Sequence, residues 1–215
     1  MHKITVVDYG FGNQFSIEQA FKMLGFQVLT TDNHKKVSNS DCIVLPGVGA
    51  FKKAMDELKR LKLDEALQYA SKNKTPILGI CLGMQLLFDE SEEFGISKGL
   101  KLIPGKVQKL PNISKRNHEL KLPNIGWNKL LLNSNFINSS KVSYIHEIKD
   151  KSFYFVHSYG VFPKDEKIIL SYFDFGGYLI PSIVKSSNLT GMQFHPEKSA
   201  DNGIKLLKSY LSNLF

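Results

Sequence analysis

Arginine is almost absent from this chain of 215 residues, although its formal net charge is +8. Arg60 and Arg116 are the two arginines, and lysines scattered along the sequence supply the remaining positive charge. Arginine makes the bidentate contacts with phosphates and bases, and no aromatic and basic RNA-binding signature is present. We therefore interpret the charge as a solvated lysine surface and expect no nucleic-acid partner. The alternative, a basic nucleic-acid binder, predicts binding to DNA or RNA that weakens steeply with salt.

Cysteine and long apolar runs are equally scarce. Cys42 and Cys81 can form one bridge at most, which does not fit a disulfide-rich secreted scaffold. No apolar run reaches the roughly 18 residues that a membrane helix needs. The segment MHKITVVDYG enters a predicted strand without the layout of a signal peptide. We expect a soluble, cytoplasmic protein that makes no membrane contact.

The first hundred residues alternate between β-prone and helical patterns. Strands are predicted at residues 3–10, 26–31, 41–47 and 77–80, and helices at 13–25, 49–61, 63–73 and 82–88. Strands that alternate with helices at these lengths form parallel sheets covered on both faces. The residues of the first helix that recur at helical spacing and are predicted to face the core are Phe15, Ile17, Ala20, Phe21 and Leu24.

After about residue 100 the pattern changes to short β-prone segments divided by Gly, Pro, Asn and Asp. These segments cover residues 105–110, 126–132, 151–159, 167–175, 180–187 and 189–194, and a helix is predicted at 198–215. We predict one α/β domain over residues 1–215. It contains an open, mostly parallel twisted sheet with flanking helices, and a smaller antiparallel sheet in the C-terminal half.

Cys81 lies in GICLG, between a predicted strand and a predicted helix. A strand that turns sharply into a helix lifts the turn residue out of the sheet, at the carboxyl end where α/β sheets bind ligands. The helix that begins at Leu82 directs free backbone N–H groups and its positive dipole end at the sulfur, which favours the nucleophilic thiolate. Cys42, inside the apolar run DCIVLPG, is interpreted instead as a buried packing residue.

A nucleophilic cysteine needs a base and a group that orients the base. The segment GMQFHPEKS provides both, because His195 follows a β-prone run, Pro196 ends that run, and Glu197 comes next. The simpler alternative is a strand end with a surface charge pair. A third requirement is N–H donors for a developing oxyanion. In LPGVGAF, the glycines on either side of Val48 allow its N–H to turn toward a ligand, although this loop alone is also an ordinary strand-to-helix connection.

Together, GICLGMQ, PGVG and the late HPE segment resemble the class I glutamine amidotransferase family over nearly the whole chain. The resemblance implies a flavodoxin-like fold and a triad in which Cys81 attacks glutamine, His195 is base and acid, and Glu197 orients His195. It also implies an oxyanion hole built from the N–H groups of Val48 and Leu82, with Val48 turned inward only in the activated state. The residues implied to hold the glutamine substrate are Gly49, Gln85, Glu93, His157, Ser158 and Tyr159. We expect neither a cofactor nor a metal ion.

Finer motifs, among them DYGFGN, GLKLIPGKV, PNIGWN and YFVHSY, resemble the branch of this family that feeds ammonia into histidine biosynthesis. The resemblance implies a heterodimer with a separate (β/α)8-barrel cyclase, because nothing in this chain resembles that barrel. The implied interface residues are Asn13, Trp127, Tyr154 and Lys198. Ordinary core packing is an equal alternative for Trp127, and a solvated surface position is the alternative for Lys198.

Two features leave other functions open. Asn124, in LPNIGWN, departs from this branch, which usually carries histidine at that position. The segment GNQFSI is closer to paralogous glutaminases that supply ammonia for amidation of a surface-polysaccharide sugar. A catalytically silent binding module that keeps the fold is a further alternative, and labelling of Cys81 by an electrophilic glutamine analogue would distinguish it from an enzyme.

Overall fold

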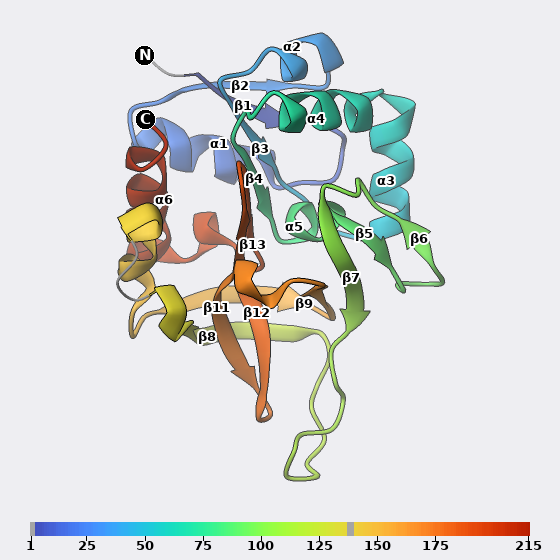
Figure 1. The fold of residues 1–215 in the computed structure, drawn as a ribbon, viewed down its shortest axis with the longest axis vertical. Coiled ribbons are helices and arrows are strands. Elements are labelled where there is room, and N and C mark those ends of the chain that lie inside the picture. The colour runs from blue at the N-terminus through green and yellow to red at the C-terminus, as the bar shows by residue number, and fades with distance from the viewer. Residues whose placement is uncertain (1–2, 137–139) are drawn as a thin grey trace.

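The centre of the protein is a twisted sheet with helices on both faces (Figure 1). The computed structural model describes residues 3–136 and 140–215. In these residues the sheet has nine strands in the order β2-β1-β3-β4-β13-β12-β11-β8-β9. The first five are parallel, and from β13 onward neighbouring strands are antiparallel. The parallel strands are β2 (Gln27–Thr31), β1 (Lys3–Val7), β3 (Cys42–Leu45), β4 (Ile77–Ile80) and β13 (Leu189–Met192). The antiparallel ones are β12 (Tyr178–Ser186), β11 (Ile169–Phe175), β8 (Asn124–Leu132) and β9 (Ser152–His157).

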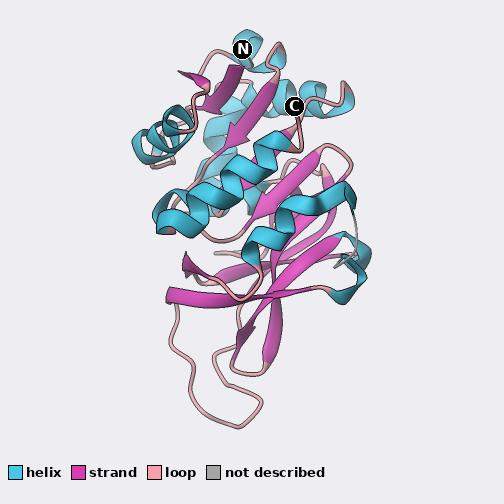
Figure 2. Ribbon diagram, turned by 90° about the vertical axis from the view of Figure 1, so that its left-hand side faces the viewer, coloured by secondary structure: helices cyan, strands magenta, loops and turns pink. Residues whose placement is uncertain are grey.

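Two hydrophobic cores cover the parallel strands, one on each face. Successive strand residues point to opposite faces, so Val6 belongs to one core and Val7 to the other. The first core packs against α1 (Gln14–Met23) and α6 (Ala200–Ser212), and Figure 2 shows helices lying across that face. The second packs against α2 (His34–Ser38), α3 (Phe51–Arg60), α4 (Leu63–Lys72) and α5 (Leu82–Leu86). The predicted α/β class, with helices on both faces of the sheet, is therefore confirmed.

A second, smaller sheet contains four strands within the described residues, in the order β10-β7-β5-β6. They are β10 (Tyr159–Pro163), β7 (Ile103–Lys109), β5 (Phe88–Ser91) and β6 (Ser97–Lys98). The prediction of a smaller sheet is confirmed, but its pairing is mixed, because β5 and β7 run parallel. Two of its strands also come from before residue 100. The helix predicted at 82–88 ends early, at Leu86, because the carbonyls of Leu86 and Leu87 accept hydrogen bonds from the N–H groups of Leu100, Leu102 and Ile103.

Other differences from the sequence-based prediction are local. Phe15 is 73% exposed, whereas Ile17 and Phe21 are buried. Phe15 lies two residues before Ile17, about 200° around the helix, and therefore points away from the core. The predicted strand at 151–159 breaks at Ser158, where the chain leaves the larger sheet for the smaller one.

Short 3₁₀ segments complete the described chain, and none was predicted. They are η1 (Ser134–Phe136), η2 (Ser140–Ile148), η3 (Glu166–Ile168) and η4 (Pro196–Lys198). Of the helices in the described ranges, none combines the length and apolar character needed to cross a membrane.

Candidate active site

Cys81 occupies a strained turn between β4 and α5. Its backbone has φ 54° and ψ −111°, a conformation that side-chain-bearing residues rarely adopt. The Cys81 N–H donates to the carbonyl of Met192 in β13 at 2.8 Å, which holds the turn against the sheet. Gly83 allows the close approach of α5, because a Cβ there would lie 1.8 Å from the carbonyl oxygen of Leu45. The turn places the sulfur at the carboxyl end of the parallel strands.

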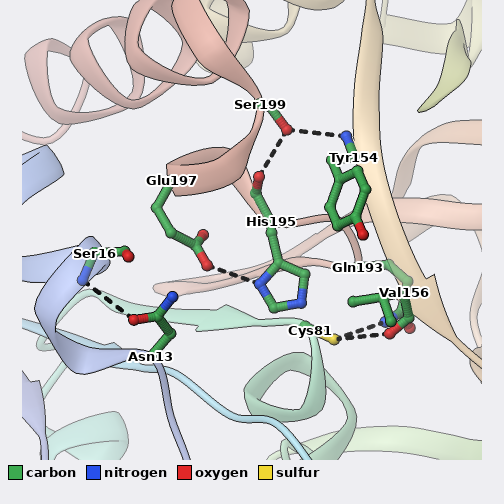
Figure 3. A network of polar contacts seen from close by, with 9 residues as sticks. All are labelled: Asn13, Ser16, Cys81, Tyr154, Val156, Gln193, His195, Glu197 and Ser199. Carbon is green, nitrogen blue, oxygen red and sulfur yellow. Dashed lines mark hydrogen bonds and ion pairs between the residues drawn. The ribbon is translucent and has the colours of Figure 1, made fainter. Parts of the chain in front are cut away.

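His195 and Glu197 lie beside this sulfur. The imidazole Nδ1 of His195 donates to Glu197 Oε1 at 2.8 Å, and the two side chains are 2% and 1% exposed (Figure 3). The other ring nitrogen, Nε2, is on the side of Cys81. It makes no hydrogen bond within ordinary geometric limits, but Cys81 is near enough to raise the pKa of the His195 ring. The structure thus brings together the three residues that the sequence predicts as a triad.

The surroundings of His195 favour its charged form. Burial lowers its pKa, but the interactions of the ring with Cys81 and Glu197 outweigh burial and raise the pKa to about 10. A protonated imidazole beside the sulfur in turn stabilises a thiolate. The pair is therefore suited to nucleophilic attack followed by proton donation.

Backbone bonds from β9 fix the position of His195. The His195 N–H donates to the carbonyl of Tyr154 at 2.9 Å. The hydroxyl of the buried Ser199 donates to the His195 carbonyl at 2.6 Å and accepts from the Tyr154 N–H at 3.0 Å (Figure 3). The sequence analysis did not identify Ser199. Its position four residues after His195 gave no signal that a strand distant in sequence would bind it.

Both N–H groups predicted as oxyanion donors already donate to backbone carbonyls. The Val48 N–H donates to the Phe11 carbonyl at 3.2 Å, and the Leu82 N–H donates to the Gly47 carbonyl at 3.3 Å. The carbonyl of the Gly47–Val48 peptide therefore binds the donor that an oxyanion would use. Gly49, with φ +99°, follows this peptide in a conformation that favours glycine. In this arrangement the peptide would have to turn over before both N–H groups could face one ligand oxygen.

A cavity of about 450 Å³ opens above Cys81. It contains every residue that the resemblance implied for glutamine binding, together with both oxyanion positions. Its lining consists of Val48, Gly49, Ala50, Cys81, Leu82, Gln85, Glu93, Phe94, Pro123, Val156, His157, Ser158 and Tyr159. His195 and Glu197 are outside this lining, behind the sulfur. Ala50, Phe94, Pro123 and Val156 were not predicted, because nothing in their local sequence marks the wall of a cavity.

Hydrogen bonds hold the side chains of Glu93 and His157 in place in the wall of this cavity. The Glu93 carboxylate accepts from the Phe51 N–H, at the start of α3, at 2.7 Å. The His157 ring binds the Tyr159 carbonyl through Nδ1 at 2.8 Å, and Asn124 Nδ2 lies 3.4 Å from Nε2. Burial lowers the pKa of His157 to about 4, so the ring is neutral at neutral pH. Because the carbonyl can only accept, Nδ1 carries the proton and Nε2 accepts from Asn124.

The four predicted interface residues lie outside the cavity lining. Trp127 is 53% exposed and packs edge-on against Tyr154, with ring centroids 6.1 Å apart, so a fully buried core position is wrong for it. Asn13 caps α1 by accepting from the Ser16 N–H at 3.4 Å, and Lys198 is exposed.

Cys42 is fully buried in β3. In the described part of the chain, no three His, Cys, Asp or Glu side chains are grouped to hold a metal ion.

Comparison with known proteins agrees with this fold and gives the family. Residues 5–212 match the family described as Glutamine amidotransferase class-I. Among solved structures, the PurLQS complex from Thermotoga maritima contains a chain that superposes with a TM-score of 0.70 at 19% identity, covering 100% of this chain and 99% of that one. The glutaminase domain of Trypanosoma brucei CTPS superposes with a TM-score of 0.65 at 19% identity, covering 99% and 94%. The chain belongs to the class I glutamine amidotransferase family.

Within that family, the chain is most usefully compared with proteins of one kind, the HisH subunits. The imidazole glycerol phosphate synthase subunit HisH of Geobacillus sp. (strain WCH70) is 40% identical over 209 residues, which cover 97% of this chain and 96% of the relative. Imidazole glycerol phosphate synthase subunit HisH 2 of Vibrio vulnificus (strain YJ016) is 42% identical over 211 residues, covering 97% and 94%. The chain is therefore similar to HisH subunits along nearly its whole length.

Proposed function

We propose that this chain hydrolyses glutamine to glutamate and ammonia, and that it supplies the ammonia to a separate (β/α)8-barrel cyclase in histidine biosynthesis. One observation carries the chemistry. Cys81, at a strained turn on the floor of the cavity, lies beside the buried ion pair of His195 and Glu197. Full-length similarity to subunits named for imidazole glycerol phosphate synthase supports the pathway.

The reaction proceeds through a covalent intermediate. The Cys81 thiolate attacks the side-chain amide carbon of glutamine, and the electron pair of the C=O bond moves to oxygen. Collapse of this intermediate breaks the C–N bond while His195 gives its proton to the departing nitrogen, which releases ammonia. Water then attacks the thioester, with His195 as base, and glutamate leaves as the sulfur is regenerated. Glu197 keeps the imidazole oriented through both steps.

The occupied oxyanion donors support a resting state of low activity. A peptide turn at Gly47–Val48 would remove the carbonyl from the Leu82 N–H and direct the Val48 N–H toward the substrate oxygen. Loss of one oxyanion donor typically lowers kcat about 100- to 1000-fold. We infer that partner binding favours the turned peptide, so that glutamine is consumed only when an ammonia acceptor is in place.

The proposed partner surface includes Trp127 and Tyr154 on β8 and β9, together with Asn13 and Lys198. The backbone of Tyr154 binds the His195 segment directly, so a partner seated on β9 would contact the strand that holds the base. Free ammonia would be protonated in bulk water near neutral pH. A protected route through the contact between the two subunits is therefore part of the proposal.

The decisive experiment combines this chain with the cyclase encoded in the same genome. Glutamine-dependent formation of imidazole glycerol phosphate is expected, with one glutamate released per turnover, and it is expected to be lost in Cys81→Ala. A matched reaction with ammonium salt in place of glutamine should restore product in that variant, which separates loss of the glutaminase from loss of the cyclase. Absence of product with glutamine, while ammonium salt supports the cyclase, would contradict the proposal.

One residue, Asn124, favours a different acceptor for the ammonia. Asn124, where the histidine-pathway branch usually carries histidine, is 8% exposed and contacts His157 in the cavity wall. The departure thus lies beside the glutamine site. In this alternative the glutaminase chemistry is unchanged and the ammonia amidates a surface-polysaccharide sugar. Glutamine hydrolysis stimulated by a sugar-amidation partner, and not by the histidine cyclase, would favour it.

A further inference from the structure

Gln193 is a buried polar residue that the proposed mechanism does not use. It follows β13 directly, it is 0% exposed, and its amide contacts two residues of the site. Figure 3 shows one of these contacts, with Cys81. Gln193 Oε1 lies 3.1 Å from Gln85 Nε2, and Gln193 Nε2 lies 3.8 Å from Cys81 Sγ. Burial of an amide is unfavourable unless its polar atoms are paired, so these contacts explain how the chain tolerates it.

A backbone carbonyl determines the direction of these hydrogen bonds. Gln85 Nε2 donates to the carbonyl oxygen of Tyr159 at 2.8 Å, and that oxygen can only accept. Rotating the Gln85 amide by half a turn would place its own oxygen against two acceptors, the Tyr159 carbonyl and Gln193 Oε1. Gln85 therefore donates both N–H groups, to Tyr159 and Gln193. Its oxygen Oε1 is left to accept from the substrate in the cavity, where Gln85 forms part of the lining.

The orientation of Gln193 follows from that of Gln85. Because its Oε1 accepts from Gln85, its NH₂ group is the end that faces Cys81. An N–H donor directed at sulfur stabilises a thiolate more than a neutral thiol, since charged acceptors form the stronger hydrogen bonds. The Tyr159 carbonyl, acting through Gln85, therefore fixes the direction of the hydrogen bond from Gln193 to Cys81.

We propose that Gln193 is a positioning residue with two roles: it donates to the Cys81 thiolate, and it locks the Gln85 amide so that its oxygen faces the substrate. The inference deepens the proposed glutaminase function and rests on it. The first role acts on the reactivity of the sulfur and the second on glutamine binding. A purely structural role for Gln193 would affect neither in a stably folded variant.

The first test measures the reactivity of the sulfur in the chain alone. The rate of Cys81 alkylation by iodoacetamide is followed against pH by intact mass. Cys42 is 0% exposed, so one fast adduct reports Cys81, and Cys81→Ala controls for this. Gln193→Glu should move the midpoint of the alkylation profile upward by about one pH unit, because a carboxylate opposes the thiolate. Gln193→Met, which removes the donor at similar length, should move it in the same direction by less.

The matched control is Gln27→Glu, which adds the same charge at an exposed position in β2. It should leave the midpoint where the unmodified chain has it. Equal midpoints in Gln193→Glu, Gln193→Met and Gln27→Glu would overturn the first role. Thermal unfolding of each variant checks that it is folded, and Gln193→Met carries the test if Gln193→Glu does not fold.

The second test measures glutamine hydrolysis in the complex. Gln193→Met should lower kcat about tenfold, the typical effect of losing one hydrogen bond to a charged group. It should also raise KM for glutamine, because the Gln85 amide keeps only the Tyr159 carbonyl as its acceptor and is held less firmly. A change in kcat with unchanged KM would overturn the second role. The alkylation profile needs neither partner nor turnover, so failure of the proposed function would appear separately, as absent hydrolysis in the unmodified complex.

Discussion

At the scale of single residues, the two buried histidines of the site have opposite charge preferences. His195 is surrounded by Cys81 and Glu197, and its pKa is raised to about 10. Burial lowers the pKa of His157 to about 4, the charge of nearby His195 adds to this effect, and the bond to the Tyr159 carbonyl opposes it without outweighing it. Burial opposes charge in both. The neighbouring groups therefore decide which ring acts as an acid and which one stays neutral in the cavity wall.

The neutral state of His157 predicts acid sensitivity. Its pKa is depressed on folding from 6.5 to about 4, so between these values the unfolded chain binds a proton that the folded chain does not. The free energy of unfolding should fall by about 2 kcal/mol from this residue between pH 7 and pH 5. Urea unfolding at both pH values should show a smaller fall in His157→Gln. The exposed control His118→Gln should keep the full pH dependence, and equal slopes in the two variants would contradict the prediction.

The Glu197 carboxylate predicts a selective effect on turnover. In Glu197→Gln the His195 ring loses its charged acceptor, and kcat for glutamine hydrolysis in the complex should fall about 10- to 100-fold. KM should change little, because Glu197 does not line the cavity. Steady-state assays of glutamate release measure both. Glu65→Gln, an exposed change of the same kind on α4, should behave like the unmodified chain, and an unchanged kcat in Glu197→Gln would be inconsistent with its role.

Single residues with a distinctive local pattern could be predicted from the sequence. Cys81 between two glycines, and His195 with a carboxylate two positions on, both pointed to chemistry. Gln193 was missed, although a polar residue inside the apolar run LTGMQF was a usable signal for a buried, hydrogen-bonded side chain. Phe15 was wrongly placed in the core because apolar character was weighed above its angular position on α1.

At the scale of elements, β9 connects the outer part of the large sheet with the site. One edge pairs with β8, and the other binds the His195 segment through Tyr154 and Ser199. Two residues further along, the Val156 carbonyl lies 3.9 Å from the Cys81 sulfur. One strand therefore contacts both the proposed base and the proposed nucleophile.

The two hydrogen bonds of Ser199 link β9 to His195, and their contribution to stability can be measured. Ser199→Ala leaves the part-buried Tyr154 N–H without its acceptor, so the free energy of unfolding should decrease by about 1–3 kcal/mol. kcat should fall as well, because the His195 carbonyl loses its donor. Urea unfolding and glutamate release measure the two effects. Ser212→Ala, at the exposed end of α6, should change stability by less than about 0.5 kcal/mol, and an equally small change in Ser199→Ala would count against this connection.

Elements defined by local periodicity were predicted well, and those defined by distant partners were not. The helices α3, α4 and α6 follow from apolar spacing along their own sequences. The strand β5 follows α5 without a turn signal, and it forms because it pairs with β6 and β7, which come later in the chain. The break at Ser158 likewise depends on which sheet each half of the segment joins. Such pairings are long-range and leave little trace in a short window of sequence.

At the scale of the whole molecule, the parallel half of the large sheet is covered by helices, whereas β8 presents an apolar surface. Ile125, Trp127 and Leu131 alternate along one side of β8, and all three are exposed. We expect the proposed partner to cover this surface, because exposed apolar groups gathered on one strand are typical of interaction sites. This surface lies on the two strands that lead to the site, which agrees with a partner that controls glutamine hydrolysis.

Trp127 should therefore contribute strongly to binding of the proposed cyclase. Its ring is 53% exposed and is held by Tyr154, so little conformational freedom is lost when a partner covers it. Trp127→Ala should weaken the complex by about 2 kcal/mol, roughly 30-fold in Kd, as measured by isothermal titration calorimetry. Tyr69→Ala is a matched control, because Tyr69 is 55% exposed and belongs to α4, which lies near the top of Figure 1, whereas β8 and β9 lie below its middle. Similar Kd values for the two variants would place the partner elsewhere, whereas a loss confined to Trp127→Ala would assign it to the β8 surface.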